Sequence, residues 1–268
     1  MNAGIDERGH LTPQTLRLLR CPVSEAVADR VRWAWVPRWS LPDGQPLTQQ
    51  VIEFPGGNLV VEPYETRFHP PEPAMSRREL TGDGWAVGLL LQPACGAALR
   101  RAPDLADEMT AVSEQIRACM SADADDSTAQ SAAGLLIAWA QQNLAAPDED
   151  GRLLNAVVDH VESDPEILTS RQLAAAVGIG QRRLQRLVAQ ALGYSPTWLI
   201  RRRRLQDAAA RIRAGESSAG LAAALGYADQ AHFQRDFKTV TGQTPGAYRG
   251  LGSGGYRSGG ENRLWNGT

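Results

Sequence analysis

The sequence predicts an α+β protein with a β-rich N-terminal part, a helical middle part and an all-α C-terminal part. Three observations lead to this prediction: short strand-like runs between turn signals, a change to helical periodicity near residue 104, and a repeated helix pair near the C-terminus. The chain has 268 residues, of which 43% are hydrophobic, so it can bury the core of one large or two ordinary domains. Disorder throughout the chain is excluded.

Residues 1–103 are expected to form the β-rich domain. Turn signals such as Pro-Gly-Gly at 55–57 divide this region into short apolar or alternating runs. The candidate strands are residues 30–39, 49–54, 58–63 and 85–93. The aromatic side chains of the region either form its core or line a small-molecule pocket. The candidates for ligand binding are Trp33, Trp35, Trp39 and Trp85.

The chain contains no motif that indicates catalysis. No nucleophile motif, phosphate-binding glycine loop or paired catalytic carboxylates occur, so we expect no enzyme activity and no cofactor. His69 lies near Glu65 and Glu72, but HPPEP is typical of a turn and no second histidine is near, so we expect a solvated loop and no metal site. The cysteines lie far apart and are expected to be structural thiols: Cys21, Cys95 and Cys119.

Hydropathy predicts a protein without membrane segments. No apolar run approaches the roughly 18 residues that a membrane-spanning helix needs. The first ten residues carry two acids and no apolar stretch, so they do not resemble a secretory signal. We therefore expect a cytoplasmic protein.

Charge divides the chain into two blocks. Residues 1–164 hold 13 basic and 24 acidic side chains, a balance of −11, whereas residues 165–268 hold 15 basic and six acidic side chains, a balance of +9. A basic region attracts phosphate and an acidic one repels it, so any contact with nucleic acid is expected in the C-terminal block. The alternative is that the basic residues are only a solvated surface.

Helical periodicity fills residues 104–164, which we expect to be a linker between the blocks. The final segment, residues 251–268, is rich in glycine and poor in apolar side chains, which predicts a mobile tail. The remaining region, residues 165–250, contains an internal repeat. LAAAVGI at 173–179 recurs as LAAALGY at 221–227, and a series of spaced residues after each copy matches as well.

Each copy predicts a short helix, a tight turn and a second helix. In the first copy, Ser170 is the expected N-cap and Gly178 the expected left-handed end of the first helix. In the second copy, Ser218 and Gly226 take these places, and Asp229 is the expected N-cap of the second helix.

The second helix of each copy leaves a polar face outside. Leu184 and Val188 are expected to be buried in the first copy, and Phe233 and Phe237 in the second. Arginine and glutamine on the opposite face suit base edges in the major groove of DNA, and an ordinary solvent-exposed face is the alternative. The candidate DNA-binding residues are Gln181, Arg182, Gln185, Arg186, Gln230, Ala231, His232, Gln234, Arg235 and Lys238.

A long helix is expected between the copies, from Pro196 to about Gly215. About 18 helical residues rise roughly 27 Å, a length that suits two recognition helices near the groove repeat of about 34 Å. The run from Arg201 to Arg204 cannot all face one way, so some of these side chains are expected to contact phosphate and others to cover acidic or apolar surface.

Residues 165–249 resemble the DNA-binding domain of AraC/XylS-type transcription regulators, most specifically through LAAALGYADQAHFQRDFKTVTGQTPGAYR at 221–249. In that family, two helix-turn-helix units joined by a long helix bind DNA as one module. Gly180 stands where serine is usual in the family. The resemblance implies base-facing positions at Arg182, Gln185, Arg186, Gln230, His232, Gln234 and Arg235.

Residues 14–100 are similar to the cupin-like sensing domains of such regulators, through features such as EFPGGNLVVEP at 53–63. We therefore expect a sequence-specific transcription regulator, an activator or a repressor, that reads two successive major-groove segments of double-stranded DNA. Control by a small-molecule effector in the N-terminal domain is a further hypothesis that rests on architecture and family analogy. RNA polymerase and a second copy in a homodimer are further candidate partners. Two alternative functions remain: a nonspecific architectural DNA-binding protein, and an enzyme with a DNA-binding appendage, against which the lack of a reactive cysteine cluster or metal-ligand spacing argues.

Overall fold

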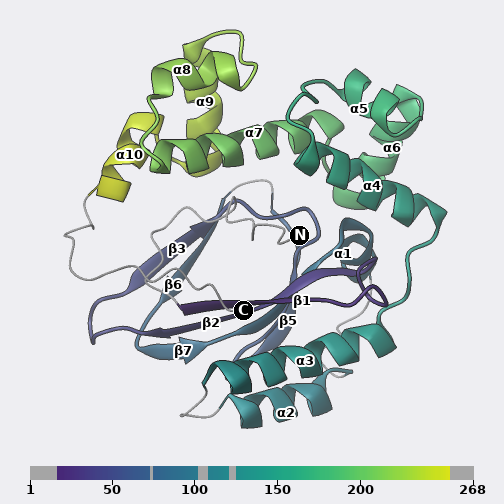
Figure 1. The fold of residues 1–268 in the computed structure, drawn as a ribbon, viewed down its shortest axis with the longest axis vertical. Helices are drawn as coiled ribbons and strands as arrows, with labels where there is room; N and C mark the ends of the chain where they lie inside the picture. The colour runs from purple at the N-terminus through teal and green to yellow at the C-terminus, as the bar shows by residue number, and fades with distance from the viewer. Residues whose placement is uncertain (1–16, 73–74, 102–107, 121–124, 254–268) are drawn as a thin grey trace, which may run out of the picture.

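The computed structural model describes residues 17–72, 75–101, 108–120 and 125–253, without the side chains of residues 218–219 and 250–253. An antiparallel β region is followed by a helical region, which confirms the predicted fold class (Figure 1). The strands are β1 (Arg17–Pro22), β2 (Val31–Ser40), β3 (Leu47–Val51), β4 (Asn58–Val61), β5 (Thr66–His69), β6 (Ser76–Leu80), β7 (Asp83–Trp85) and β8 (Val87–Leu91). The helices are α1 (Pro93–Leu99), α2 (Thr110–Cys119), α3 (Asp126–Asn143), α4 (Glu149–Ser163), α5 (Ser170–Ala176), α6 (Gln181–Leu192), α7 (Pro196–Arg213), α8 (Ser218–Ala224), α9 (Gln230–Thr241) and α10 (Pro245–Ser253).

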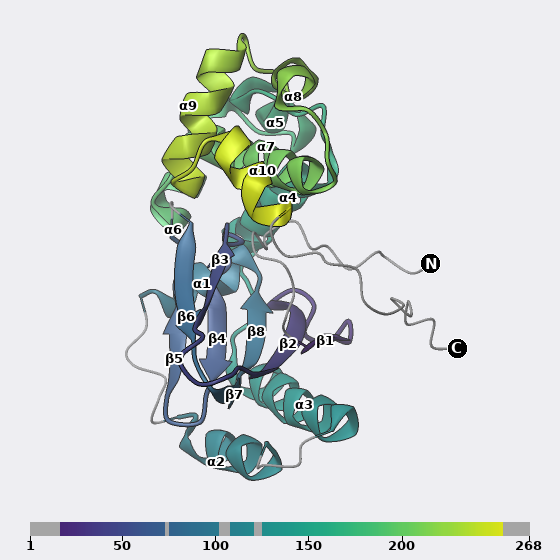
Figure 2. The same cartoon turned by 90° about the vertical axis from the view of Figure 1, so that its left-hand side faces the viewer.

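The strands form two antiparallel sheets. The larger sheet has the order β1-β2-β8-β4-β5, with β7 paired to one end of β2, and β3 and β6 form a separate two-stranded sheet (Figure 2). Three of the predicted strands correspond to β2, β4 and the β7–β8 region, and the fourth overlaps β3. The strands β1, β5 and β6 have no counterpart among the predicted runs, because they are short and charged side chains interrupt their apolar pattern.

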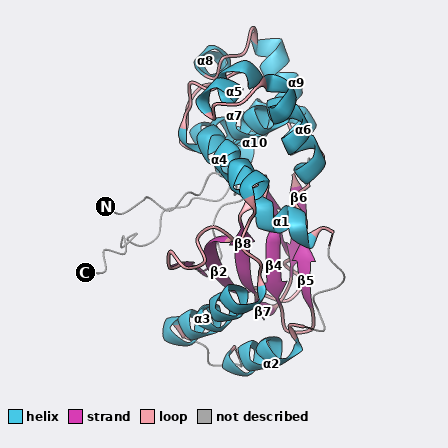
Figure 3. Cartoon of the chain, turned by 90° about the vertical axis from the view of Figure 1, so that its right-hand side faces the viewer, coloured by secondary structure: helices cyan, strands magenta, loops and turns pink. Residues whose placement is uncertain are grey.

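The two faces of the larger sheet have different neighbours. Alternation along β2 places Ala34 and Val36 in a core with α2 and α3, which lie together under the sheet (Figure 3). The helix α3 contributes a stripe of alanines with Leu136 and Trp139 to the same core. The opposite face carries Trp33 and Trp35, which belong to the side of the sheet that meets the helical region.

The predicted linker, residues 104–164, divides between the two regions. The helices α2 and α3 pack on the sheet, whereas α4 packs with α5, α6 and α7 and with α1 at the end of the β region. The helix α3 begins within a polar stretch of the linker, where the carboxylate of Asp125 caps the helix by accepting a hydrogen bond from the N–H of Thr128. Helical periodicity predicts which face of a helix is buried but not which domain covers it.

The helices α4 to α10 form the all-α region, with α7 running between two helix pairs (Figures 1 and 2). One core joins α4, α5 and α6 to the first part of α7, and a second core joins α8, α9 and α10 to its last part. The segment predicted as a tail starts inside α10, and residues 254–268 lie outside the described residues. Among the described helices, none has both the length and the apolar composition that a bilayer span requires.

Candidate nucleic-acid interface

The first helix-turn-helix unit consists of α5, a tight turn and α6. The hydroxyl of Thr169 accepts a hydrogen bond from the N–H of Gln172, so Thr169 is the N-cap of α5. The predicted cap, Ser170, is instead the first helical residue. Gly178 ends the helix with φ of +68°, as predicted, and Gly180 precedes α6 without a side-chain hydrogen bond to the helix start.

The second unit consists of α8, a turn and α9. Gly226 has φ of +70° and occupies the same place as the turn glycine of the first unit. The carboxylate of Asp229 accepts a hydrogen bond of 2.7 Å from the N–H of His232, which confirms Asp229 as the N-cap of α9. The predicted cap of α8, Ser218, lies outside the described side chains. Both units therefore have the geometry of a helix-turn-helix.

Both recognition helices, α6 and α9, keep their polar faces at the surface. Leu184 and Val188 of α6 are fully buried, and so are Phe233 and Phe237 of α9, as the sequence predicts. The exposed residues include every candidate for DNA binding: Gln181, Arg182, Gln185, Arg186, Gln230, Ala231, His232, Gln234, Arg235 and Lys238. The arrangement leaves these side chains accessible to a ligand as large as a DNA groove.

Neighbouring groups orient part of the face of α9. The half-buried carboxylate of Asp236 pairs with Arg201 at 3.0 Å and lies 3.6 Å from Nε2 of His232. The ring of Tyr227 meets His232 edge-on, with centroids 5.3 Å apart. Arg235 donates from Nε to the carbonyl of Ala231 one turn earlier. These contacts hold His232 and Arg235 close to the helix.

The arginine run of α7 faces inward. Arg202 and Arg203 are only 2% and 4% exposed. Arg202 donates from Nη1 to Glu162 at 2.6 Å, and Arg203 donates from Nη2 to Asp207 at the same distance. Both guanidinium groups therefore neutralise carboxylates inside the protein and are covered from solvent.

The other two arginines of the run also have partners in the protein. Arg201 pairs with Asp236, and the guanidinium of Arg204 lies 3.9 Å from the ring centroid of Tyr227. The expectation that part of the run covers acidic or apolar surface is confirmed for Arg202 and Arg203, because α7 lies between two helical units and the β region. Contact with phosphate stays a prediction for Arg201, whose side chain is 34% exposed.

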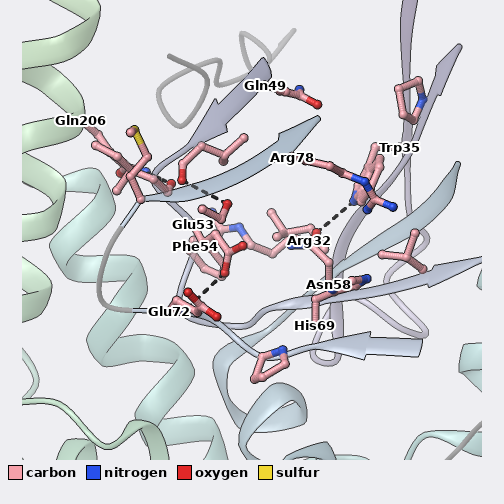
Figure 4. A pocket seen from close by; sticks show the side chains of 18 of the residues that line it. Arg32, Trp35, Gln49, Glu53, Phe54, Asn58, His69, Glu72, Arg78 and Gln206 are labelled. Atoms are coloured by element: carbon pink, nitrogen blue, oxygen red, sulfur yellow. Dashed lines mark hydrogen bonds between the residues drawn. The ribbon is translucent and has the colours of Figure 1, made fainter. Parts of the chain in front are cut away.

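A cavity of about 670 Å³ lies between the β region and the helices α4 and α7 (Figure 4). Its size is within the range of small-molecule sites. The helical region contributes Glu162, Arg202 and Gln206 to its wall. Arg202 also donates from Nε to the carbonyl of Glu53, and Gln206 donates to the carbonyl of Ile52, so α7 is bonded directly to the backbone of the opposite wall.

The aromatic wall of the cavity comes mainly from β2. A register shift between Val31 and Trp33 turns Arg32 and Trp33 toward the same side, and Trp35 follows two residues later. The indole of Trp35 lies against Gly88 of β8, where an added Cβ would meet the ring at 2.3 Å, and its N–H donates to Asn58 at 3.1 Å. Glycine is required there because the ring occupies the space of a side chain.

The cavity lining holds six arginines and three glutamates, and most of the arginines pair with acidic groups. The guanidinium of Arg32 lies 4.4 Å from the ring centroid of Phe54. Burial raises the pKa of Glu53, and the nearby Glu72 adds to this effect. Burial lowers the pKa of His69, and so do the charges of the neighbouring arginines. Both shifts favour the neutral form of these groups.

Residues 173–250 match the family model described as a helix-turn-helix domain. The match spans most of the first unit, the long helix and the whole second unit. The C-terminal region therefore contains a helix-turn-helix domain, as the sequence predicts.

Several solved structures are similar to this chain. ToxT from Vibrio cholerae O395 is 12% identical with a TM-score of 0.42, over 90% of this chain and 98% of ToxT. A structure of ToxT from Vibrio cholerae strain SCE256 with bound unsaturated fatty acid is 11% identical with a TM-score of 0.40, over 91% and 97% of the two chains. The AraC-like transcriptional activator CuxR is 14% identical with a TM-score of 0.22, over 72% and 95%.

The predicted ligand-binding tryptophans separate into two pairs. Trp33 and Trp35 line the cavity, whereas Trp39 and Trp85 are not part of its wall. The ring of Trp39 covers Gly84, where an added Cβ would lie 2.2 Å away. The cavity residues that the sequence analysis missed are mainly arginines of different strands and the polar residues of α4 and α7. No sequence signal links them, because the fold brings them together from distant segments.

Proposed function

We propose that this chain is an AraC-like transcription regulator that reads two successive major-groove segments of one DNA duplex, with one recognition helix in each. The observation that carries the proposal is the exposed Gln/Arg face that recurs at matching positions of α6 and α9. Arginine pairs with guanine and glutamine with adenine in the major groove. The 18 residues of α7 correspond to a rise of roughly 27 Å, which suits binding on neighbouring turns of the duplex.

The charge distribution along the chain also supports DNA binding through the C-terminal region. Residues 165–268 carry a balance of +9, and residues 1–164 carry −11. Phosphate neutralisation by the exposed basic residues would add affinity that depends on salt but not on sequence. The acidic N-terminal part would be held away from the phosphates.

Binding-site selection tests sequence specificity. The full chain is used to select duplexes from a random pool, and the selected DNA then competes with random DNA for the protein. We expect a preference of at least about 10³ for the selected sequence. A ratio near one would support the alternative, a nonspecific architectural DNA-binding protein.

Two substitutions test direct readout. Arg186→Ala and Arg235→Ala should each weaken binding to the selected DNA by about 1–3 kcal/mol and relax the preference at one or two base positions. The matched control is Arg183→Ala, because Arg183 pairs with Asp150 beside the reading face. If either variant weakens binding to all sequences equally, its arginine contacts phosphate and not bases.

We also propose that the cavity between the domains binds an effector, an organic anion with an apolar or aromatic body. Trp33, Trp35 and Phe54 offer apolar and aromatic surface, and the arginines outnumber the carboxylates of the wall. Protonation of Glu53 removes a negative charge, and protonation of His69 adds a positive one. An anion should therefore bind more tightly as pH falls through the pKa values of these two groups.

Thermal unfolding of the full chain tests the effector site, with 1-naphthoate as the probe and its neutral amide as the control. At 100 times its dissociation constant, a probe that binds only the folded state adds about 2.7 kcal/mol to the free energy of unfolding. We expect stabilisation by the acid alone, and more of it at lower pH. Equal stabilisation by acid and amide would contradict the role of the arginines.

The remaining predictions concern the cellular setting. A cytoplasmic location, contact with RNA polymerase and a homodimer stay predictions from the sequence. The oligomeric state is the most direct to measure, by analytical ultracentrifugation of the full chain with and without selected DNA.

A further inference from the structure

The recognition helices α6 and α9 correspond to each other residue by residue. Each has 12 residues, and each is followed by a glycine in the left-handed conformation, Gly193 with φ of +79° and Gly242 with φ of +75°. When the helices are aligned from their first residues, Gln181 and Gln230, the order of exposed and buried residues is the same over the first ten positions. Matching positions therefore lie at the same level and on the same face of the two helices.

The turns that lead into the two helices differ in length without changing this correspondence. Four residues separate α5 from α6, and five separate α8 from α9. The fourth residues of the two recognition helices, Leu184 and Phe233, are nevertheless both fully buried, and so are the eighth, Val188 and Phe237. The extra residue is thus accommodated before α9 begins, and both helices turn the same positions away from the protein core.

The exposed face is identical at the first, fifth and sixth positions of the two helices. Arginine pairs bidentately with guanine, and glutamine pairs with adenine, in the major groove. The same side chains at the same positions are therefore suited to the same bases. The matching pairs are Gln181 and Gln230, Gln185 and Gln234, and Arg186 and Arg235.

The second position of the face differs between the helices. It is Arg182 in α6 and Ala231 in α9, and both residues are exposed. Arg182 can donate two hydrogen bonds to the edge of guanine, whereas the methyl group of Ala231 can make only an apolar contact, for which the methyl group of thymine is the matching partner. The two helices are thus suited to different bases at this position.

Other exposed differences between the helices are less suited to base reading. At the third position, Arg183 pairs with Asp150 at 3.2 Å, and His232 lies 3.6 Å from Asp236, so both side chains have partners in the protein. The ninth and tenth positions also differ, but they lie in the third turn, and base contacts come mainly from the N-terminal residues of a recognition helix. The second position is therefore where the two faces differ most in base reading.

We propose that the two half-sites of the DNA share the bases read by the three identical positions and differ at one base, which is guanine for Arg182 and thymine for Ala231. These two residues are then the specificity-determining pair of the repeat. The proposal rests on the proposed function, because it specifies the DNA that the two helices read. The alternative is that the helices dock at different angles, so that identical residues meet different bases.

Binding-site selection with the full chain, wild type and Ala231→Arg, tests the proposal. The substitution gives α9 the four reading residues of α6, and the half-site of α9 is identified by the relaxed preference of Arg235→Ala. We expect one thymine of that half-site to change to guanine, with at least about fivefold discrimination, and the other half-site to stay the same. The control Thr239→Arg adds the same charge in the third turn and should strengthen binding to all sequences without changing a base.

The reverse variant, Arg182→Ala, should change one guanine to thymine in the half-site of α6. The proposal is wrong if the wild type selects a defined sequence whose half-sites share no bases when aligned in either direction. It is also wrong if Ala231→Arg selects the wild-type sequence. Both outcomes leave the proposed function intact, whereas a wild-type protein that selects no sequence would contradict the proposed function itself.

Discussion

The two helix-turn-helix units share a plan but differ in how each is supported. Both have a turn glycine with positive φ, two fully buried residues in the recognition helix and a glycine at its end. The second recognition helix has a side-chain cap, Asp229, whereas Gly180 leaves the first without one. Each unit also completes its core with residues of the β region: Phe54, Leu90 and Ala97 for the first, and Ile52 and Met75 for the second. The repeat thus specifies the reading geometry, and the rest of the chain supplies unequal support.

The largest expected difference between the units comes from their buried anchors. Phe233 is fully buried and packs against the rings of Tyr227 and Phe237, with centroids 5.3 and 5.8 Å away. Phe233→Ala should lower the free energy of unfolding by about 3–5 kcal/mol, measured by urea denaturation. The equivalent change in the first unit, Leu184→Ala, should cost about 2–5 kcal/mol, because fewer atoms are removed from an equally buried site.

These two substitutions separate the units if the chain unfolds in more than one step. Loss of the first unit by Leu184→Ala should leave the selectivity at the half-site read by α9, and Phe233→Ala should do the reverse. Footprinting on selected DNA reports both half-sites. Loss of both half-sites with either variant would show that the units fold as one and would remove the distinction between them.

The long helix that joins the units provides the second prediction. Arg202 lies at 2.6 Å from Glu162 in a buried pair, and also bonds to the backbone of the β region. Arg202→Ala leaves a buried carboxylate with less compensation, and should cost about 3 kcal/mol of unfolding free energy. Its neighbour Arg201 has a partly exposed pair with Asp236, so Arg201→Ala should cost about 0.2–1 kcal/mol. Equal losses of unfolding free energy for the two variants would mean that the buried position of Arg202 between the domains adds nothing to stability.

Much of the reading surface could be predicted from the sequence, because local patterns determine it. The glycines, the buried anchors and the exposed face of each recognition helix follow from spacing within about 20 residues. The N-cap of α5 was predicted one residue late, since Thr169 and Ser170 are adjacent hydroxyl residues and either suits the pattern. Packing between distant segments could not be predicted from the sequence, because the apolar face of a helix does not show which element it packs against.

The arginine run and the cavity illustrate this limit. A basic run is usually solvated, and Arg202 and Arg203 are covered only because two units and the β region meet around α7. The cavity combines strands, α4 and α7, so its wall cannot be assembled from any single segment. Trp33 and Trp35 were distinguishable from Trp39 and Trp85 only once the pairing of β2 with β8 was known.

Capping is the third way to test the difference between the units. Asp229→Ala removes the acceptor for the N–H of His232 and should cost about 1 kcal/mol of unfolding free energy. Because the freed N–H group belongs to a residue of the reading face, binding to selected DNA should weaken as well. The control is Asp229→Asn, which keeps an acceptor oxygen and should restore most of the loss. A cost for Asn as large as that for Ala would mean that the charge, and not the cap, stabilises α9.

The smallest expected effect is a gain in the first unit. Gly180 has φ of −71° and ψ of 146°, the extended conformation that serine caps adopt, and no atom lies within 4 Å of an added Cβ. Gly180→Ser should therefore supply the missing cap and stabilise the chain by a few tenths of a kcal/mol. Urea denaturation of Gly180→Ser beside Gly180→Ala measures the gain, since alanine adds the Cβ without an acceptor. Equal stability of these two variants would show that the start of α6 gains nothing from a cap, and that the two units differ in more than one side chain at this position.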